Sequence, residues 1–267
     1  MFLVKKAIWS ILLVFIISTI FFTMGFMFEE KVEGVQDYLD TFKETEEIRV
    51  DNHHINKNSS KKTTPQPNHN KFEPVFSYSS LSEENIRKIK EVSWKPSAPV
   101  SLEELSYVKV TYWGFDDREH VGELIVHEKV AEEVVEIFEE LYKGKFPIER
   151  IKLIDEYGAN DDLSMEDNNT SSFCFRVVSG SKKLSKHSYG IAIDINPLQN
   201  PYVKGDKVSP KAGKEYLDRN NVRMGMIIKD DICYKAFKSK GWIWGGDWKT
   251  VKDYQHFQKD IHVKELK

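Results

Sequence analysis

The longest apolar stretch of the chain lies near its start, where the 22 residues from Ala7 to Phe28 carry no charge. A helix of this length spans about 30 Å, which is the thickness of the hydrocarbon core of a membrane. Lys5 and Lys6 precede the stretch and two glutamates follow it, so we expect the remainder of the chain outside the cytoplasm. We therefore predict a transmembrane anchor over residues 1–28. Secretion after cleavage of a signal peptide is the alternative, but no small-x-small cleavage site follows.

Residues 29–71 form the most polar part of the chain and show no apolar periodicity. A segment of this composition buries too little apolar surface to offset the entropy lost on ordering. We therefore predict a disordered polar linker that tethers the anchor to a folded domain. His53, His54 and His69 lie within this segment, and we interpret them as solvated side chains.

Regular periodicity begins near residue 72. Residues 107–113 and 122–127 are rich in β-formers and predict two strands joined by a turn. Residues 128–142 carry apolar side chains at helical spacing, which predicts an amphipathic helix. Further strands are expected at 151–155, 173–178 and 189–195, helices at 82–92 and 231–240, and an acidic solvated loop at 160–170. Because strands and helices mix without regular βαβ alternation, the predicted fold class is α+β, a mostly antiparallel sheet with flanking helices in one domain over residues 72–267.

Charge and cysteine content narrow the classes of function. The chain has 39 basic and 42 acidic residues, a net charge of −3 that gives no polyanion-binding signature and argues against a nucleic-acid partner. Its two cysteines, Cys174 and Cys233, are too few for a disulfide-stapled scaffold. We expect both to stay reduced as small buried side chains, with a single bridge as the alternative.

The stretch Ser185-Lys-His187-Ser-Tyr-Gly190-Ile-Ala-Ile-Asp194 carries the first candidate chemistry. In a plain strand His187 and Asp194 would lie on opposite faces, because they are separated by an odd number of residues. Gly190 permits a bulge or turn that lets both side chains point at one atom. Histidine nitrogen and carboxylate oxygen are both good zinc ligands, but two ligands do not make a site.

A third ligand is available downstream in Asp253-Tyr-Gln-His256. His256 would bind the metal, and Asp253 would lie beside it without binding. Catalytic zinc sites commonly use three protein ligands and keep the fourth position for water, from which a nearby carboxylate removes a proton. His262 is an alternative third ligand, but it lacks an aspartate three residues before it.

The order Ser-x-His-x-x-Gly-x-Ala-x-Asp followed by Asp-x-x-His resembles the M15 family of zinc peptidases, which is related in fold to the Hedgehog signalling domain. Residues 168–176, 194–202 and 241–248 are also similar to the endopeptidase-like branch of that family. The resemblance covers residues 105–257. It implies one zinc ion held by His187, Asp194 and His256.

By the same resemblance, Asp253 is the general base and Arg176 faces the scissile carbonyl, where a guanidinium could stabilise the oxyanion. The family contains D-alanyl-D-alanine carboxypeptidases, D,D-dipeptidases and L-alanyl-D-glutamate endopeptidases. The implied reaction is hydrolysis of an amide bond in a peptidoglycan stem peptide, and the residues do not distinguish a carboxypeptidase from an endopeptidase. The alternative is a zinc-stabilised module that binds wall peptides without cutting them, although such a module has no need of a base at Asp253.

Other polar and aromatic residues have plainer interpretations. His120 and His127 flank a predicted strand and are expected to be structural. Ser185 is expected to hydrogen-bond the backbone or Asp194 rather than to act as a nucleophile. The tryptophans in residues 241–248 could line a cleft or fill the core, and both interpretations stay open.

Overall fold

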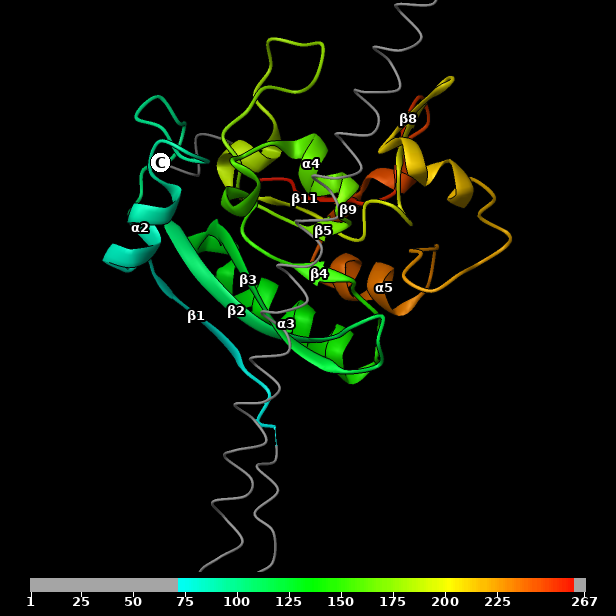
Figure 1. The fold of residues 1–267 in the computed structure, drawn as a ribbon, viewed down its shortest axis with the longest axis horizontal. Helices are drawn as coiled ribbons and strands as arrows, with labels where there is room; N and C mark the ends of the chain where they lie inside the picture. Colours follow the sequence, from blue (N-terminus) through cyan, green and yellow to red (C-terminus); the bar gives the residue numbers. More distant parts are fainter. Residues whose placement is uncertain (1–71, 262–267) are drawn as a thin grey trace, which may run out of the picture. The chain divides into compact units, whose positions relative to one another are not determined.

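The fold was obtained as a computed structural model, and the structure describes residues 72–261 (Figure 1). The predicted anchor over residues 1–28, the predicted linker over residues 29–71, and His262 lie outside the described residues. Among residues 72–261, no helix is both long enough and apolar enough to cross a membrane.

The largest sheet is three-stranded and antiparallel. Its strands, in spatial order, are β1 (Phe76–Ser80), β2 (Leu105–Trp113) and β3 (Glu119–His127). The chain then enters α3 (Glu128–Lys143) directly, because the ring of His127 accepts a hydrogen bond from the backbone N–H of Lys129 at 3.1 Å and caps the helix. The sequence predicted both long strands and this helix, and all three are confirmed.

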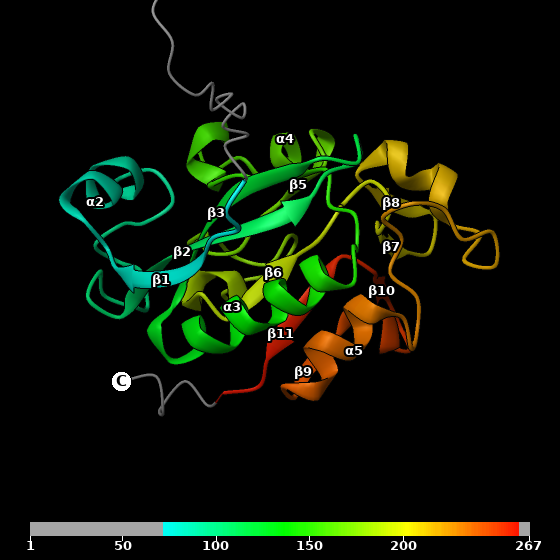
Figure 2. The ribbon, with the colours of Figure 1, turned by 90° about the horizontal axis from the view of Figure 1, so that it is seen from below.

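A second antiparallel sheet shares its hydrophobic core with the first. Its strands, in spatial order, are β6 (Ala192–Asp194), β11 (His256–Lys259) and β9 (Trp242–Trp244). The predicted helix α5 (Ile232–Ser239) lies beside α3 (Figure 2), and its Phe237 stacks on Phe257 of β11 with ring centroids 4.0 Å apart. Both rings are fully buried. This core fixes β6 and β11, the two strands that carry predicted metal ligands.

The remaining elements are short. The third sheet has the order β10 (Lys252–Asp253), β7 (Tyr202–Lys204) and β8 (Lys207–Ser209), and β4 (Arg150–Ile151) pairs in parallel with β5 (Asn169–Thr170). The other helices are α2 (Glu83–Ile89), α4 (Asp161–Glu166) and the 3₁₀ turns η1 (Ile154–Tyr157), η2 (Lys186–Tyr189), η3 (Lys211–Tyr216) and η4 (Gly245–Asp247).

The α+β fold class with antiparallel pairing is confirmed, but the expectation of one main sheet is corrected. The described residues form four small sheets, because most strands after β3 are only two to four residues long. The prediction of a strand at 173–178 is also wrong. Cys174 donates its N–H to the carbonyl oxygen of His187, and Phe175 donates to that of Ser93, so the two residues pair with separate segments.

The prediction of an acidic solvated loop at 160–170 was wrong in part, because this segment contains α4. The side chain of Asn160 accepts a hydrogen bond from the N–H of Leu163 at 3.1 Å and caps the helix. Asp161 and Asp162 occupy the first turn, where negative charge favours the helix dipole. The helix matters because it borders the site described next.

Candidate metal centre

Strand pairing brings two of the predicted ligands together. In the antiparallel ladder between β6 and β11, Asp194 is the direct partner of His256. Directly opposed residues of such a ladder present their side chains on the same face of the sheet. Asp194 Oδ1 consequently lies 2.9 Å from His256 Nδ1.

His187 reaches the same point from η2. The hydroxyl of Ser185 accepts the N–H of His187 at 3.3 Å and caps this turn, and Gly190 ends it with φ +66°. A Cβ at position 190 would lie 2.5 Å from the backbone nitrogen of His127, so a glycine is needed for the turn to pass β3 this closely. The turn predicted at Gly190 is therefore present. It places His187 Nε2 3.1 Å from Asp194 Oδ2.

The hydrogen bonds on the outer side of each imidazole fix which nitrogen faces inward. His187 Nδ1 lies 2.7 Å from the carbonyl oxygen of Ser172, and His256 Nε2 lies 3.1 Å from the amide oxygen of Gln258. An oxygen of either kind can only accept, so each outer nitrogen carries the proton. The inner nitrogens, His187 Nε2 and His256 Nδ1, then direct their lone pairs at each other, 3.2 Å apart, and at the Asp194 carboxylate.

This donor set fits a zinc ion. With both imidazoles neutral, two lone pairs and a carboxylate converge in a buried space, and either a proton on His256 or a metal cation between them relieves the repulsion. Ligands bound tetrahedrally to zinc at about 2.0–2.2 Å are separated by about 3.3–3.6 Å. Here His256 Nδ1 lies 2.9 Å from Asp194 Oδ1, His187 Nε2 lies 3.1 Å from Asp194 Oδ2, and the two nitrogens are 3.2 Å apart. One donor atom from each residue lies within 4.8 Å of the others, so a small outward shift of the side chains gives the spacing that zinc needs. His187, Asp194 and His256 are therefore the residues that could hold a metal.

The charges around the three residues point the same way. Burial alone would raise the pKa of Asp194, but His187 and His256 outweigh it and hold that pKa far below its usual range. Burial opposes protonation of His256, yet the Asp194 carboxylate raises the pKa of this histidine to about 9. The pocket thus attracts positive charge, as a cation site does.

Asp253, the predicted base, lies at the end of β10 and lines the same cleft. Burial raises its pKa to about 7, and the Asp194 carboxylate adds to this against the opposing charge of His256. Within the described part of the chain, its Oδ1 is buried and has no hydrogen-bond partner. This oxygen can therefore accept a hydrogen bond or a proton from a group that enters the cleft.

Arg176 also lines the cleft, and its backbone is fixed by the metal-ligand motif. The Ser188 hydroxyl accepts the N–H of Arg176 at 2.9 Å and donates to its carbonyl oxygen at 2.7 Å. The guanidinium pairs with Asp161 of α4 at 3.0 Å. Burial alone would lower the pKa of Arg176, but Asp161 and Asp194 raise it, so the side chain remains a fixed positive charge.

These groups surround a cleft of about 360 Å³. Besides the polar residues, its lining contains apolar side chains from separate segments, namely Met165, Val178, Leu184, Trp248 and Val251. The Trp248 ring lies 5.6 Å from the His256 ring, whereas Trp242 and Trp244 are buried in the core. Each of the two interpretations of residues 241–248 therefore holds for part of the segment.

Sequence reasoning missed three supporting residues. Gln258 lies two positions after His256 on the same strand face, so strand periodicity could have found it. Ser172 acts through its backbone carbonyl, which leaves no sequence signal. Asp161 meets Arg176 only through the tertiary fold, and its helix was taken for a loop.

The other predicted residues lie away from the cleft lining. His127 is buried and caps α3, and His120 pairs with Asp116 at 2.9 Å near the turn between β2 and β3, so both have the structural setting that was expected. Cys174 and Cys233 are buried free thiols, which confirms that they do not form a bridge.

Comparison with known proteins supports the family suggested by the motif. Residues 179–259 match an M15 peptidase family model described as D-alanyl-D-alanine carboxypeptidase. The matched segment contains His187, Asp194, Asp253 and His256, whereas Arg176 precedes it. No solved structure gives a significant match, so the Hedgehog-like fold stays a prediction. The family match therefore supports an M15 peptidase and lies on residues 179–259, the segment that carries all three candidate ligands.

Proposed function

We propose that this chain is a zinc-dependent peptidase that hydrolyses amide bonds in peptidoglycan stem peptides. The observation that carries the proposal is the convergence of His187 Nε2, His256 Nδ1 and the Asp194 carboxylate at one point in a cleft. The outward-facing protons of both imidazoles support it, because they leave only lone pairs for the metal. The family match over residues 179–259 supports the class of reaction.

His187, Asp194 and His256 would hold one zinc ion, which when bound would polarise the scissile carbonyl and activate a water molecule. Asp253 would accept the proton of that attacking water through its unpaired buried oxygen and then return it to the leaving amine. The carboxylate is held at the cleft because β10 pairs with β7 and Asp253 packs against Gly245 at the start of η4.

Arg176 would stabilise the negative charge that develops on the carbonyl oxygen. A fixed guanidinium needs no reorganisation during the reaction, and the Asp161 carboxylate and the Ser188 hydroxyl provide that fixation. The Trp248 ring and the neighbouring apolar side chains would exclude water from the peptide bond.

We also propose that residues 7–28 anchor the protein in the cell membrane, with the peptidase domain outside the cytoplasm where the wall is found. The uncharged apolar run and the lysines before it support this placement. The full-length protein should stay in the membrane fraction after alkaline extraction. Recovery of only a shortened, secreted form would contradict the anchor.

The peptidase proposal is tested by measuring bound zinc and stem-peptide hydrolysis on the same preparations. Wild-type protein should release new peptide termini that mass spectrometry detects. His187→Ala and His256→Ala should lose both zinc and hydrolysis, whereas His120→Ala, an exposed histidine outside the cleft, should keep both. Full zinc content in both ligand variants would refute the metal assignment. Wild-type protein that binds stem peptide with zinc in place and never cleaves it would indicate the non-catalytic binding module.

A further inference from the structure

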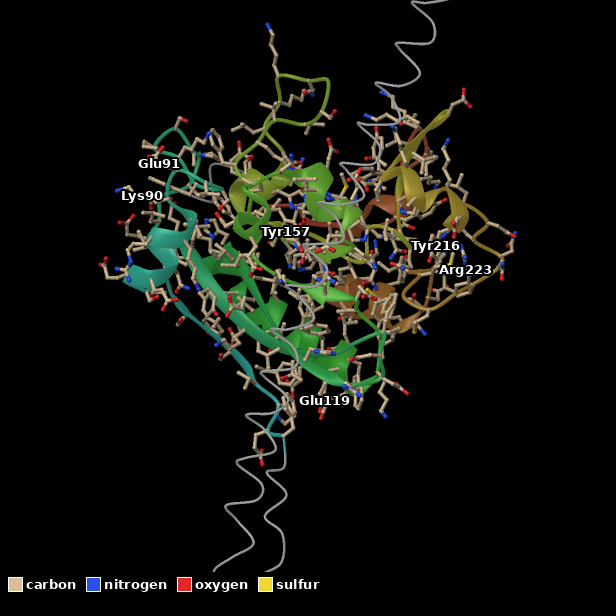
Figure 3. All side chains as sticks on the ribbon, viewed as in Figure 1. Lys90, Glu91, Glu119, Tyr157, Tyr216 and Arg223 are labelled. Atoms are coloured by element: carbon tan, nitrogen blue, oxygen red, sulfur yellow. The ribbon has the colours of Figure 1, made fainter. Side chains whose placement is uncertain are left out.

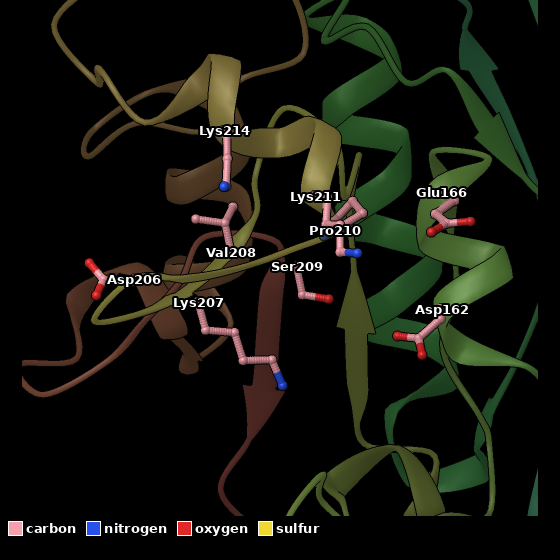
Figure 4. Close-up of a pocket in the computed structure, with 9 residues that line it drawn as sticks. All are labelled: Asp162, Glu166, Asp206, Lys207, Val208, Ser209, Pro210, Lys211 and Lys214. Carbon is pink, nitrogen blue, oxygen red and sulfur yellow. The ribbon is translucent and has the colours of Figure 1, made fainter.

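A second groove has a volume of about 440 Å³ (Figure 4). Asp162, Lys207 and Ser209 line both this groove and the metal cleft, so the two hollows are neighbours. The groove contributes nothing to the proposed chemistry, because none of the candidate ligands, Asp253 or Arg176 lines it.

The floor of the groove is formed by β8, which belongs to the same sheet as β10, the strand that carries Asp253. Across the β10-β7-β8 sheet, Asp253 is opposite Tyr202, and Tyr202 is opposite Ser209. Neighbouring strands lie about 4.8 Å apart, so the backbone of Ser209 is about 10 Å from that of Asp253, the length of about three extended peptide residues. A peptide that crosses the sheet from the cleft therefore enters the groove about three residues from the bond that is cut.

The two walls of the groove carry opposite charge (Figure 4). Asp162 and Glu166 lie four residues apart on α4, and hence on one face of that helix. Lys207 on β8 and Lys211 and Lys214 on η3 lie on the facing wall, which also carries Asp206 and therefore has a net positive charge. Among residues 72–261, the two α4 carboxylates and the three lysines make no ion pair within 4.0 Å, unlike the adjacent Asp161, which pairs with Arg176.

Both walls are held in place. The ion pair between Asp161 and Arg176 ties α4 to the metal cleft. On the other side, the Arg223 guanidinium lies 3.8 Å from the ring centre of Tyr216 at the end of η3 (Figure 3), and Arg219 donates to the carbonyl oxygen of Tyr216 at 3.2 Å. These contacts hold the backbones of α4 and η3, which carry the two groups of charges.

We propose that this groove is a subsite for a peptide segment in which a free carboxylate and a free amine lie on neighbouring residues. The carboxylate would face the lysine wall, and the amine would face Asp162 and Glu166. Given the proposed function, on which this inference rests, the segment is the acidic residue of a stem peptide followed by its diamino residue. The groove would thus select for both charges of the stem peptide.

The test uses three synthetic stem pentapeptides: one with both charges, one with the free carboxylate of the acidic residue converted to an amide, and one with the side-chain amine acetylated. Binding to the full-length Asp253→Asn protein is measured by calorimetry. Each modification should weaken binding about threefold, because solvent-exposed ion pairs contribute about 0.2–1 kcal/mol. Lys211→Gln should reduce the penalty for amidation and keep the penalty for acetylation, and Glu166→Gln should do the reverse. Higher salt should reduce both penalties.

Lys235→Gln on α5 is the matched control, since Lys235 is exposed and lines neither hollow, and it should change neither penalty. Equal binding of the three peptides, or equal effects of Lys211→Gln and Lys235→Gln, would overturn the subsite. Hydrolysis by wild-type protein is scored separately. Hydrolysis without charge preference would refute the groove and keep the peptidase, whereas charge-selective binding without hydrolysis would refute the peptidase and keep the groove.

Discussion

Gly190→Ala should reduce both the stability of the protein and its zinc content. Position 190 has φ +66°, which costs an L-residue about 1–2 kcal/mol. The new Cβ would also lie 2.5 Å from the backbone nitrogen of His127, and forced overpacking of this kind costs about 1–3 kcal/mol. The sum is about 2–5 kcal/mol, which for a domain of this size lowers the melting temperature by roughly 4–20 °C. His187 lies three residues earlier in the same turn, so its nitrogen should move away from Asp194.

Gly158→Ala separates the two contributions. Gly158 has φ +61°, but a Cβ there would meet no atom within 4 Å, so only the backbone cost of about 1–2 kcal/mol applies. Thermal unfolding followed by circular dichroism, with zinc per chain measured after dialysis, compares the two variants. Gly158→Ala should keep its zinc. If Gly190→Ala is no less stable than Gly158→Ala and retains full zinc, the close approach of η2 to β3 does not position His187.

Three further variants probe separate parts of the structure. Asp253→Asn keeps the side-chain volume and removes the proton-accepting charge. Stem-peptide turnover should therefore fall by ~10²-fold or more with zinc content unchanged. Full activity of this variant would refute the assignment of Asp253 as the general base. Gln258→Leu removes the hydrogen-bond acceptor that orients the His256 ring. A zinc titration should show an affinity for zinc that is lower by about 10–100-fold. Unchanged affinity would show that Gln258 does not orient His256. Phe237→Ala opens a cavity in the core that the two sheets share. Chemical denaturation should show a free energy of unfolding that is lower by about 3–5 kcal/mol. A loss below 1 kcal/mol would show that the surrounding side chains close the cavity.

The sequence could predict the parts of the fold that have strong periodicity. The helix over residues 128–142 and the strands around 107–113 and 122–127 were predictable because a long amphipathic pattern is dictated by burial of one face. The short strands β7 to β11 were not, since a segment of two to four residues shows no reliable period. Helix α4 was missed because its acidic composition is typical of a solvated loop, although Asn160 is a normal N-cap.

The candidate site was predictable where residue type and spacing carry the chemistry. His187, Asp194 and His256 were chosen as metal ligands from their order in the chain, and the structure brings them together. Their supporting partners depend on the tertiary fold. The carbonyl of Ser172 and the pairing of Asp161 with Arg176 arise from segments that touch only after folding, so no local pattern announces them.

The most direct test of a zinc-dependent peptidase is reconstitution of the full-length protein after its metal has been removed with a chelator. Hydrolysis of a stem peptide is measured by chromatography as zinc is added back, and bound zinc is measured in parallel. We predict that the rate is negligible without metal and rises in proportion to bound zinc until one ion is bound per chain. Hydrolysis that persists in metal-free protein, or its absence when one zinc ion is fully bound, would contradict the proposed function.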